Sequence, residues 1–219
     1  TMAGIVAGCI TSTGLASKLL RAIVSASGGV MIVALLLTML CCIVLGMGVP
    51  TTATYCIMAA TCAPILMSPE IGVEMLAAHF FVFYFGIVAD ITPPVALAAY
   101  AGAAIAKAGP MKTAFNASRL AIAAFIVPYI IAMNPAMLFI NTTIPEVVMI
   151  TITSIIGIFG VAAGLSGFVF RNMKWWERIL CIVGGLTLLV PGSLTDLIGL
   201  VLVGAVCVLG YQAAKREKE

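Results

Sequence analysis

Residues 90–94, Asp-Ile-Thr-Pro-Pro, interrupt a long apolar stretch and constrain the fold more than any other feature of the chain. The flanking residues 80–89 and 95–106 are almost entirely apolar. Adjacent prolines remove two backbone donors and favour extended geometry before them, so no continuous helix can pass. Because lipid cannot satisfy the backbone groups that are freed, the break must lie inside protein or line a water-filled cavity. Broken helices of this kind hold ions and substrates in secondary transporters, so transport is the leading hypothesis.

The composition predicts a membrane protein. The chain has 219 residues, of which 63% are hydrophobic and 9% charged, whereas soluble domains are about half apolar and a quarter charged. We therefore expect an all-α polytopic membrane protein. The net charge of +3 is small, so nucleic acid is not an expected partner.

The residues that metal sites and enzymes need are scarce. The seven cysteines show no C-x-x-C spacing and the chain has a single histidine, so we expect no transition-metal site and no cofactor. No nucleophile–base pair and no pair of facing acids is evident, so an enzyme is not expected. The cysteines are interpreted as small buried hydrophobes.

The apolar segments differ in length. Residues 147–170 match the ~20 residues that cross ~30 Å of hydrocarbon, and residues 179–190 and 194–209 flank Pro191-Gly192-Ser193. A basic loop is expected over 107–119 and a turn-rich connection over 134–145. Positive loops favour the cytoplasmic side, which places 107–119, 171–178 and the tail there. Between 30 and 106 the segments are short, so full crossings and re-entrant hairpins both remain open.

Polar breaks recur in the first half of the chain. They are Thr11-Ser12-Thr13-Gly14, the stretch from Gly46 to Thr52, and Asp90 to Pro94. Unwound carbonyls and hydroxyls could coordinate Na⁺ without extra charge. Helices that begin after Pro50 and Pro94 would instead attract an anionic substrate to their N-terminal ends.

Each break also has a purely structural interpretation. Gly46-x-Gly48-x-Pro50 could be a packing kink, and the hydroxyls of Thr11 to Thr13 could bond along their own helix. Asp90 could cap a helix that starts near Pro93 or lie at the membrane interface. An ionisable group within a membrane segment is nevertheless a candidate for function.

Two stretches carry a resemblance to a known family. They are residues 46–55, Gly-Met-Gly-Val-Pro-Thr-Thr-Ala-Thr-Tyr, followed by Ala-Pro-Ile-Leu at 63–66, and residues 81–98, which contain the Asp-Ile-Thr-Pro-Pro break. Both resemble the large membrane subunit of tripartite ATP-independent periplasmic (TRAP) transporters, in the branch whose small and large membrane subunits are fused. Phe125-Ile126-Val127-Pro128 and Asn134-Pro135-Ala136 extend the resemblance over residues 1–140. Residues 141–219 are similar to the additional C-terminal transmembrane helices and basic cytoplasmic tail of some fused members.

The resemblance implies a transport mechanism. It implies Na⁺-coupled import of a small organic anion, such as a carboxylate, delivered by a periplasmic substrate-binding protein across a bacterial or archaeal cytoplasmic (inner) membrane. Such permeases contain two inverted repeats, and one domain moves past a scaffold in the manner of an elevator. This chain would hold the second repeat, with its broken helices or re-entrant hairpin. It is expected to be a C-terminal fragment whose partners include the N-terminal repeat, the small-subunit helices and the lipid bilayer.

The family's ion-binding loops map onto particular positions of this sequence: Gly46, Gly48, Pro50, Thr51, Thr52, Thr92, Pro93 and Pro94. Asp90 joins them as an ionisable group within a membrane segment, and Thr11, Ser12 and Thr13 are a possible further polar element. Two alternatives remain. One is a citrate- or dicarboxylate-type carrier that needs no binding protein. The other is a non-transporting membrane scaffold whose glycines pack helices.

Overall fold

The computed structural model describes residues 5, 8–9, 12–140, 142–190 and 192–216. Within these residues the chain is helical, and its only extended pairing is an isolated bridge between Phe168 and Asn172. The predicted all-α architecture is confirmed. The chain forms two compact units, Thr1–Ala132 and Met133–Glu219. The boundary between them directly precedes the turn-rich connection expected at 134–145.

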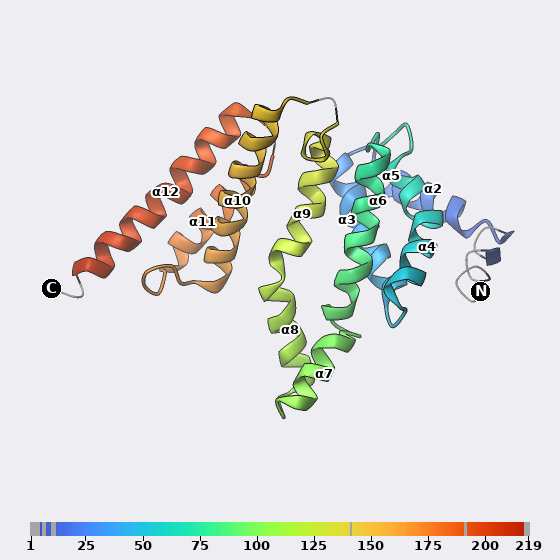
Figure 1. Ribbon diagram of the computed structural model, residues 1–219, viewed down its shortest axis with the longest axis horizontal. Helices are drawn as coiled ribbons and strands as arrows, with labels where there is room; N and C mark the ends of the chain where they lie inside the picture. The colour runs from blue at the N-terminus through green and yellow to red at the C-terminus, as the bar shows by residue number, and fades with distance from the viewer. Residues whose placement is uncertain (1–4, 6–7, 10–11, 141, 191, 217–219) are drawn as a thin grey trace. The chain divides into compact units, whose positions relative to one another are not determined.

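Unit 1 is a succession of short helices, labelled in Figure 1. They are α2 (Leu15–Ser27), α3 (Met31–Gly46), α4 (Thr51–Thr61), α5 (Ala63–Leu66), α6 (Met75–Val88), the 3₁₀ turn η1 (Ala89–Ile91), α7 (Leu97–Ile105), α8 (Pro110–Leu120) and α9 (Ile122–Met133). Three apolar segments, Met31–Gly46, Thr51–Leu66 and Met75–Ile91, are shorter than a full membrane span. Each of them begins or ends at one of the predicted breaks.

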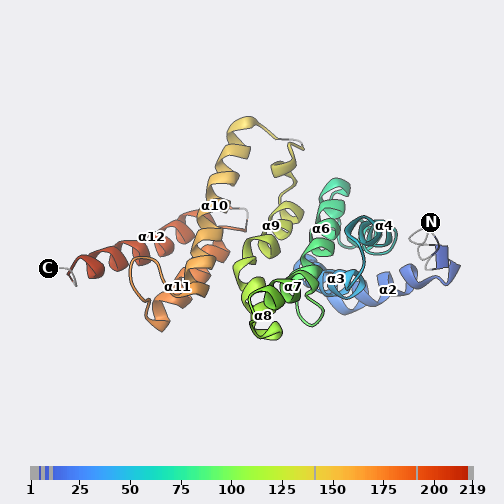
Figure 2. The same ribbon diagram turned by 60° about the horizontal axis from the view of Figure 1, so that its bottom comes forward.

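Helices α3, α4 and α6 pack on one another and form the core of unit 1, and α2 covers α3, α4 and α5 (Figures 1 and 2). Leu35, Met58 and Phe81 come from these three helices and are fully buried. Helix α9 joins the core through Tyr129, whose ring lies 5.3 Å from that of Phe81. Close van der Waals packing of such side chains is the main attraction between helices in a membrane.

The expected basic loop over 107–119 is wrong, because most of it is helical. Pro110 opens α8 at a position where the missing N–H of proline costs nothing. Ala114 is fully buried, whereas Lys112 and Arg119 are exposed, so an amphipathic helix accommodates the charges that suggested a loop. Helices α7 and α8 pack together as a hairpin, visible in Figure 2, and α8 and α9 are bent by 42° at their junction.

Unit 2 contains α10 (Ile144–Ser166), α11 (Trp175–Thr187) and α12 (Ser193–Arg216), preceded by the 3₁₀ turn η2 (Pro135–Leu138). Helix α10 and residues Leu194–Gln212 of α12 are long and apolar enough to cross a membrane. The predicted span at 147–170 is confirmed, although the helix ends earlier because Gly167 adopts φ 73°. A positive φ of this kind is the common way to end a helix.

Close contact between backbones holds unit 2 together. A Cβ atom added at Gly185 of α11 would lie 2.6 Å from the Gly157 carbonyl oxygen and 2.8 Å from the Val161 nitrogen of α10. On the other side of α11, a Cβ atom at Gly184 would lie 2.8 Å from the Cβ atom of Leu202 on α12. Small residues that allow helices to approach in this way are typical of the contacts between membrane helices.

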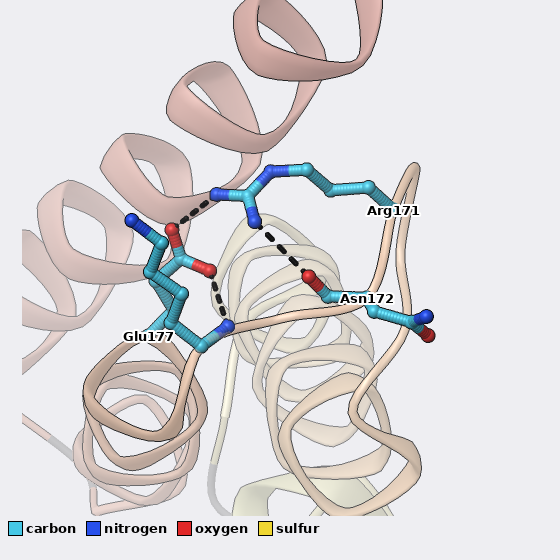
Figure 3. Close-up of polar contacts among 4 residues, drawn as sticks. Arg171, Asn172 and Glu177 are labelled. Atoms are coloured by element: carbon cyan, nitrogen blue, oxygen red, sulfur yellow. Dashed lines mark hydrogen bonds and ion pairs between the residues drawn. The ribbon is translucent and has the colours of Figure 1, made fainter. Parts of the chain in front are cut away.

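Two arginines organise the turn between α10 and α11. Arg178 donates to the carbonyls of Gly164 and Leu165, each at 2.9 Å, and so satisfies the C-terminal end of α10. Figure 3 shows Arg171 paired with the buried carboxylate of Glu177. The other carboxylate oxygen of Glu177 accepts the backbone N–H of Lys174 at 2.7 Å. A buried charge requires such pairing.

The packing predicts that Gly185→Ala lowers the free energy of unfolding by about 1–3 kcal/mol, because the new methyl group meets backbone atoms that cannot move aside. Gly204→Ala on α12 is the matched control, since nothing lies within 4 Å of its added Cβ atom. Thermal unfolding of the purified protein in detergent, followed by circular dichroism, measures both changes. Equal stability of the two variants would contradict the close contact of Gly185 with the backbone of α10.

Candidate functional site

The first predicted break is present between α3 and α4. Helix α3 ends at Gly46, Gly48 adopts φ 71°, and Pro50 is extended at φ −56° and ψ 141° before α4 begins at Thr51. The left-handed conformation at Gly48 explains the glycine there, since side chains other than that of glycine rarely adopt it. The chain therefore leaves one helix and enters the next through residues 47–50.

Thr54 stabilises this turn, although the sequence did not single it out. Its hydroxyl donates to the Val49 carbonyl at 3.0 Å, and its side chain is fully buried. The signal was present in the repeated threonines at 51, 52 and 54. Their periodicity gave no indication of which one faces inward: Thr54 is buried, whereas Thr51 and Thr52 are exposed.

The second predicted break is present between α6 and α7. Helix α6 ends at Val88, η1 follows, and residues 92–96 are not helical. The Pro93–Pro94 peptide bond is cis, and Ala96 adopts φ 35° as the residue that precedes α7. The proline pair therefore interrupts the apolar stretch, as expected.

Side chains from α7 and α8 hold the second break in place. The Ser118 hydroxyl donates to the Ile91 carbonyl at 3.0 Å, and the Tyr100 hydroxyl donates to the Pro94 carbonyl. Thr92 donates to the Val88 carbonyl at 2.7 Å. The sequence did not identify Ser118, because the segment that carries it was interpreted as a loop.

Asp90 lies within η1 and is half-buried. The interpretation of Asp90 as a cap for a helix near Pro93 is wrong, because α7 begins at Leu97 and its preceding residue is Ala96. In the described part of the chain the Asp90 carboxylate makes no hydrogen bond or ion pair. It is therefore available to a cation.

The structure brings the two breaks together. A Cβ atom added at Gly46 would lie 2.9 Å from the Ala89 Cβ atom and 3.4 Å from the Gly86 carbonyl oxygen. A Cβ atom at Gly86 would lie 3.1 Å from the Cγ2 atom of Thr54. The end of α3 thus crosses the end of α6 at the point where both helices stop. Gly46 is therefore both the last residue of α3 and the residue that packs against Ala89.

Several backbone groups at these breaks find no hydrogen-bond partner within the described part of the chain. Among the described residues no hydrogen bond reaches the carbonyl oxygens of Met47, Gly48, Pro93 or Val95. The N–H groups at the start of α4, at residues 51–53, likewise find no acceptor there. Unpaired oxygens suit a cation, and unpaired N–H groups at a helix start suit an anion.

The described hydroxyls of the third predicted polar element form local hydrogen bonds. Ser12 and Thr13 are exposed, and both hydroxyls donate to the Cys9 carbonyl, at 3.2 and 2.8 Å. Thr11 lies outside the described residues. The geometry at Ser12 and Thr13 agrees with hydroxyls that bond along their own segment.

Comparison with known families agrees with this geometry. The family described as "Tripartite ATP-independent periplasmic transporter, DctM component" matches residues 1–147, and a domain of unknown function (DUF3394) matches residues 147–201. No curated protein and no solved structure matches the chain. The chain belongs to the family of the DctM component, a membrane component of TRAP transporters.

The contact between the breaks predicts a rescue experiment. Gly46→Ala is expected to lower the free energy of unfolding by about 1–3 kcal/mol, because its methyl group meets that of Ala89. The double variant Gly46→Ala/Ala89→Gly moves the methyl group across the contact, so most of the loss is expected to be regained. Thermal unfolding measures this coupling.

Gly102→Ala on α7 is the control, since nothing lies within 4 Å of the added Cβ atom and its stability is expected to be unchanged. Strictly additive effects of the Gly46 and Ala89 substitutions would show that the two positions do not touch.

Proposed function

We propose that this chain carries part of the ion pathway of a Na⁺-coupled importer of small organic anions. The observation that supports the proposal is the meeting of two helix breaks at Gly46 and Ala89, with unpaired carbonyl oxygens beside them. Lipid offers these oxygens no partner, so a bound ion, water or another protein segment must satisfy them. Unwound carbonyls that coordinate Na⁺ are a known solution in transporters.

The oxygen donors suit a hard monovalent cation. The carbonyls of Gly48 and Pro93 carry no net charge, so several of them can surround Na⁺ at little electrostatic cost. Thr92 adds a hydroxyl whose hydrogen already points to the Val88 carbonyl at 2.7 Å, which leaves its lone pairs available to a cation. The unpaired carboxylate of Asp90 supplies one negative charge to the same break.

The start of α4 provides a complementary place for the solute. The N–H groups of Thr51 and Thr52 lie at the positive end of the dipole of this 11-residue helix, and no acceptor reaches them within the described residues. A carboxylate or a similar anionic group is the ligand that such a helix end favours. Cation and anion would then share one region, which is a physical basis for coupled movement.

Family membership supports the remaining parts of the proposal. A TRAP transporter would receive its solute from a periplasmic substrate-binding protein and would operate in the cytoplasmic membrane of a bacterium or archaeon. The present chain would contribute the second inverted repeat, and an N-terminal repeat with the small-subunit helices would complete the sites. Movement of one domain past a scaffold is the proposed mechanism of transport.

A scaffold role has its main support in unit 2. There the glycines at 157, 184 and 185 lie against neighbouring backbone or side-chain atoms, which is a packing function. In unit 1 the helices stop at Gly46 and Val88 instead of continuing. These breaks leave carbonyl oxygens without a partner among the described residues, which packing alone does not require, so transport is the better explanation for unit 1.

Reconstitution of the complete permease in vesicles tests the function. We expect uptake of the solute only when a Na⁺ gradient and the substrate-binding protein are both present. Uptake that needs neither the gradient nor Na⁺ would contradict the proposed Na⁺ coupling. Uptake that needs Na⁺ and proceeds without the binding protein would instead support a citrate- or dicarboxylate-type carrier.

Two substitutions test the ion ligands. Thr92→Val removes a hydroxyl and Asp90→Asn removes a charge, so each is expected to raise the half-saturating Na⁺ concentration about tenfold, which corresponds to about 1.4 kcal/mol. Thr92→Ser keeps the hydroxyl, and Glu70→Gln removes an exposed carboxylate from the 67–74 turn. Both controls are expected to retain the original Na⁺ dependence. Unchanged Na⁺ dependence in Thr92→Val and Asp90→Asn would exclude both groups as ligands.

A further inference from the structure

A surface cavity of about 470 Å³ lies in unit 2, outside the proposed ion pathway. Its lining comes from the end of α12 and from the turn after α10: Phe170, Cys207, Val208, Tyr211, Gln212 and Lys215. The α12 residues are spaced so that they occupy one face of the helix. Phe170 closes the cavity against this face, with its ring 5.5 Å from that of Tyr211.

The cavity lies where two membrane-spanning helices end. Helix α10 ends at Ser166, and the apolar part of α12 ends at Gln212. The contact between Phe170 and Tyr211 places these two ends at the same membrane surface. Lys215 is three residues beyond the apolar part of α12, about 4.5 Å further along the helix axis.

The lining changes from apolar to polar in the direction of the water. Cys207 and Val208 lie within the apolar part of α12, whereas the Gln212 amide and the Lys215 ammonium group lie at its end and beyond. A phospholipid has the same order, with an acyl chain at membrane depth and a phosphate at the surface. Lysine side chains reach headgroups in this way by extending their stems along apolar surface.

The charges around the cavity favour an anionic headgroup. The cavity has no acidic residue in its lining. Arg171 is already paired with Glu177, and Arg178 is bonded to the end of α10 (Figure 3 shows the first pair). Lys215, in contrast, has no carboxylate partner in the described part of the chain. Among the residues that line the cavity, Lys215 is the cationic one.

Aromatic residues on the same turn agree with a location at the membrane surface. Trp175 and Trp176 begin α11, and they are 78% and 47% exposed. Exposed tryptophans at the end of apolar helices are typical of the headgroup region of a bilayer. A ligand that reaches this cavity therefore has its polar part among lipid headgroups.

We propose that this cavity binds one anionic phospholipid, such as phosphatidylglycerol, with its phosphate on Lys215 and Gln212 and an acyl chain along Val208 and Phe170. Basic pockets between membrane helices recognise anionic headgroups in this manner. The site is separate from the two helix breaks and does not depend on the proposed transport function.

Native mass spectrometry of the full chain tests the proposal. The protein is released from detergent with equal amounts of phosphatidylglycerol and phosphatidylcholine of the same acyl chains, and the ratio of the two bound lipids is measured. Lys215→Gln is expected to lower this ratio roughly fivefold, and Lys215→Arg is expected to preserve it. Lys174→Gln is the matched control, because Lys174 is exposed on the same surface and does not line the cavity.

A second variant tests the cavity without changing any charge. Val208→Trp fills the apolar part of the cavity, so it is expected to reduce bound phosphatidylglycerol while leaving the thermal unfolding midpoint near that of the unmodified protein. An excess of inorganic phosphate is expected to leave the lipid bound, because phosphate provides no acyl chain.

Three results would overturn the proposal. Equal losses in Lys215→Gln and Lys174→Gln would indicate diffuse attraction by surface charge. An undiminished amount of bound phosphatidylglycerol in Val208→Trp would place the lipid outside the cavity. Displacement by inorganic phosphate would indicate a site for a soluble anion.

Discussion

Backbone carbonyl and amide groups at membrane depth have no water to bond, and this constraint governs unit 1. Its apolar helices can stop only where something other than lipid receives the freed groups. The two stops, after Gly46 and after Val88, lie against each other through Gly46 and Ala89. Thr54 and Ser118 satisfy some of the freed carbonyls. The oxygens of Gly48 and Pro93 have no partner among the residues that the structure describes, and they are the basis for the proposed cation pathway.

In unit 2, glycines allow helices to pack closely and do not interrupt them. Its helices are complete, so their backbone groups bond internally, and their glycines allow close packing instead of breaks. The charges of the turn between α10 and α11 are satisfied within the protein, through the pair of Arg171 with Glu177 and through Arg178 on the end of α10. Lys215 is exposed, lines the surface cavity and has no carboxylate partner among the described residues, so we expect it to contact lipid headgroups.

The breaks were predictable because proline and glycine act locally. Two prolines at 93–94 interrupt a helix in any environment, and Gly48 allows the positive φ of the first turn. Other parts were not predictable in this way. Residues 110–120 form an amphipathic helix in which Ala114 is buried and Lys112 and Arg119 are exposed, so the charges do not mark a loop. The interpretation of Asp90 as a helix cap is wrong because the next helix begins at Leu97. The residue before that helix is the buried Ala96.

The sequence alone determined the all-α membrane class, the resemblance to the large TRAP subunit and the positions at which the helices stop. Each of these depends on hydrophobicity or on the covalent geometry of a few residues. Tertiary structure decided that the two breaks meet, that Thr54 and Ser118 support them, and that Ser12 and Thr13 bond within their own segment. It also decided which carbonyls remain unpaired and which lysine faces a cavity. These outcomes depend on the crossing of helices distant in sequence, which no local pattern specifies.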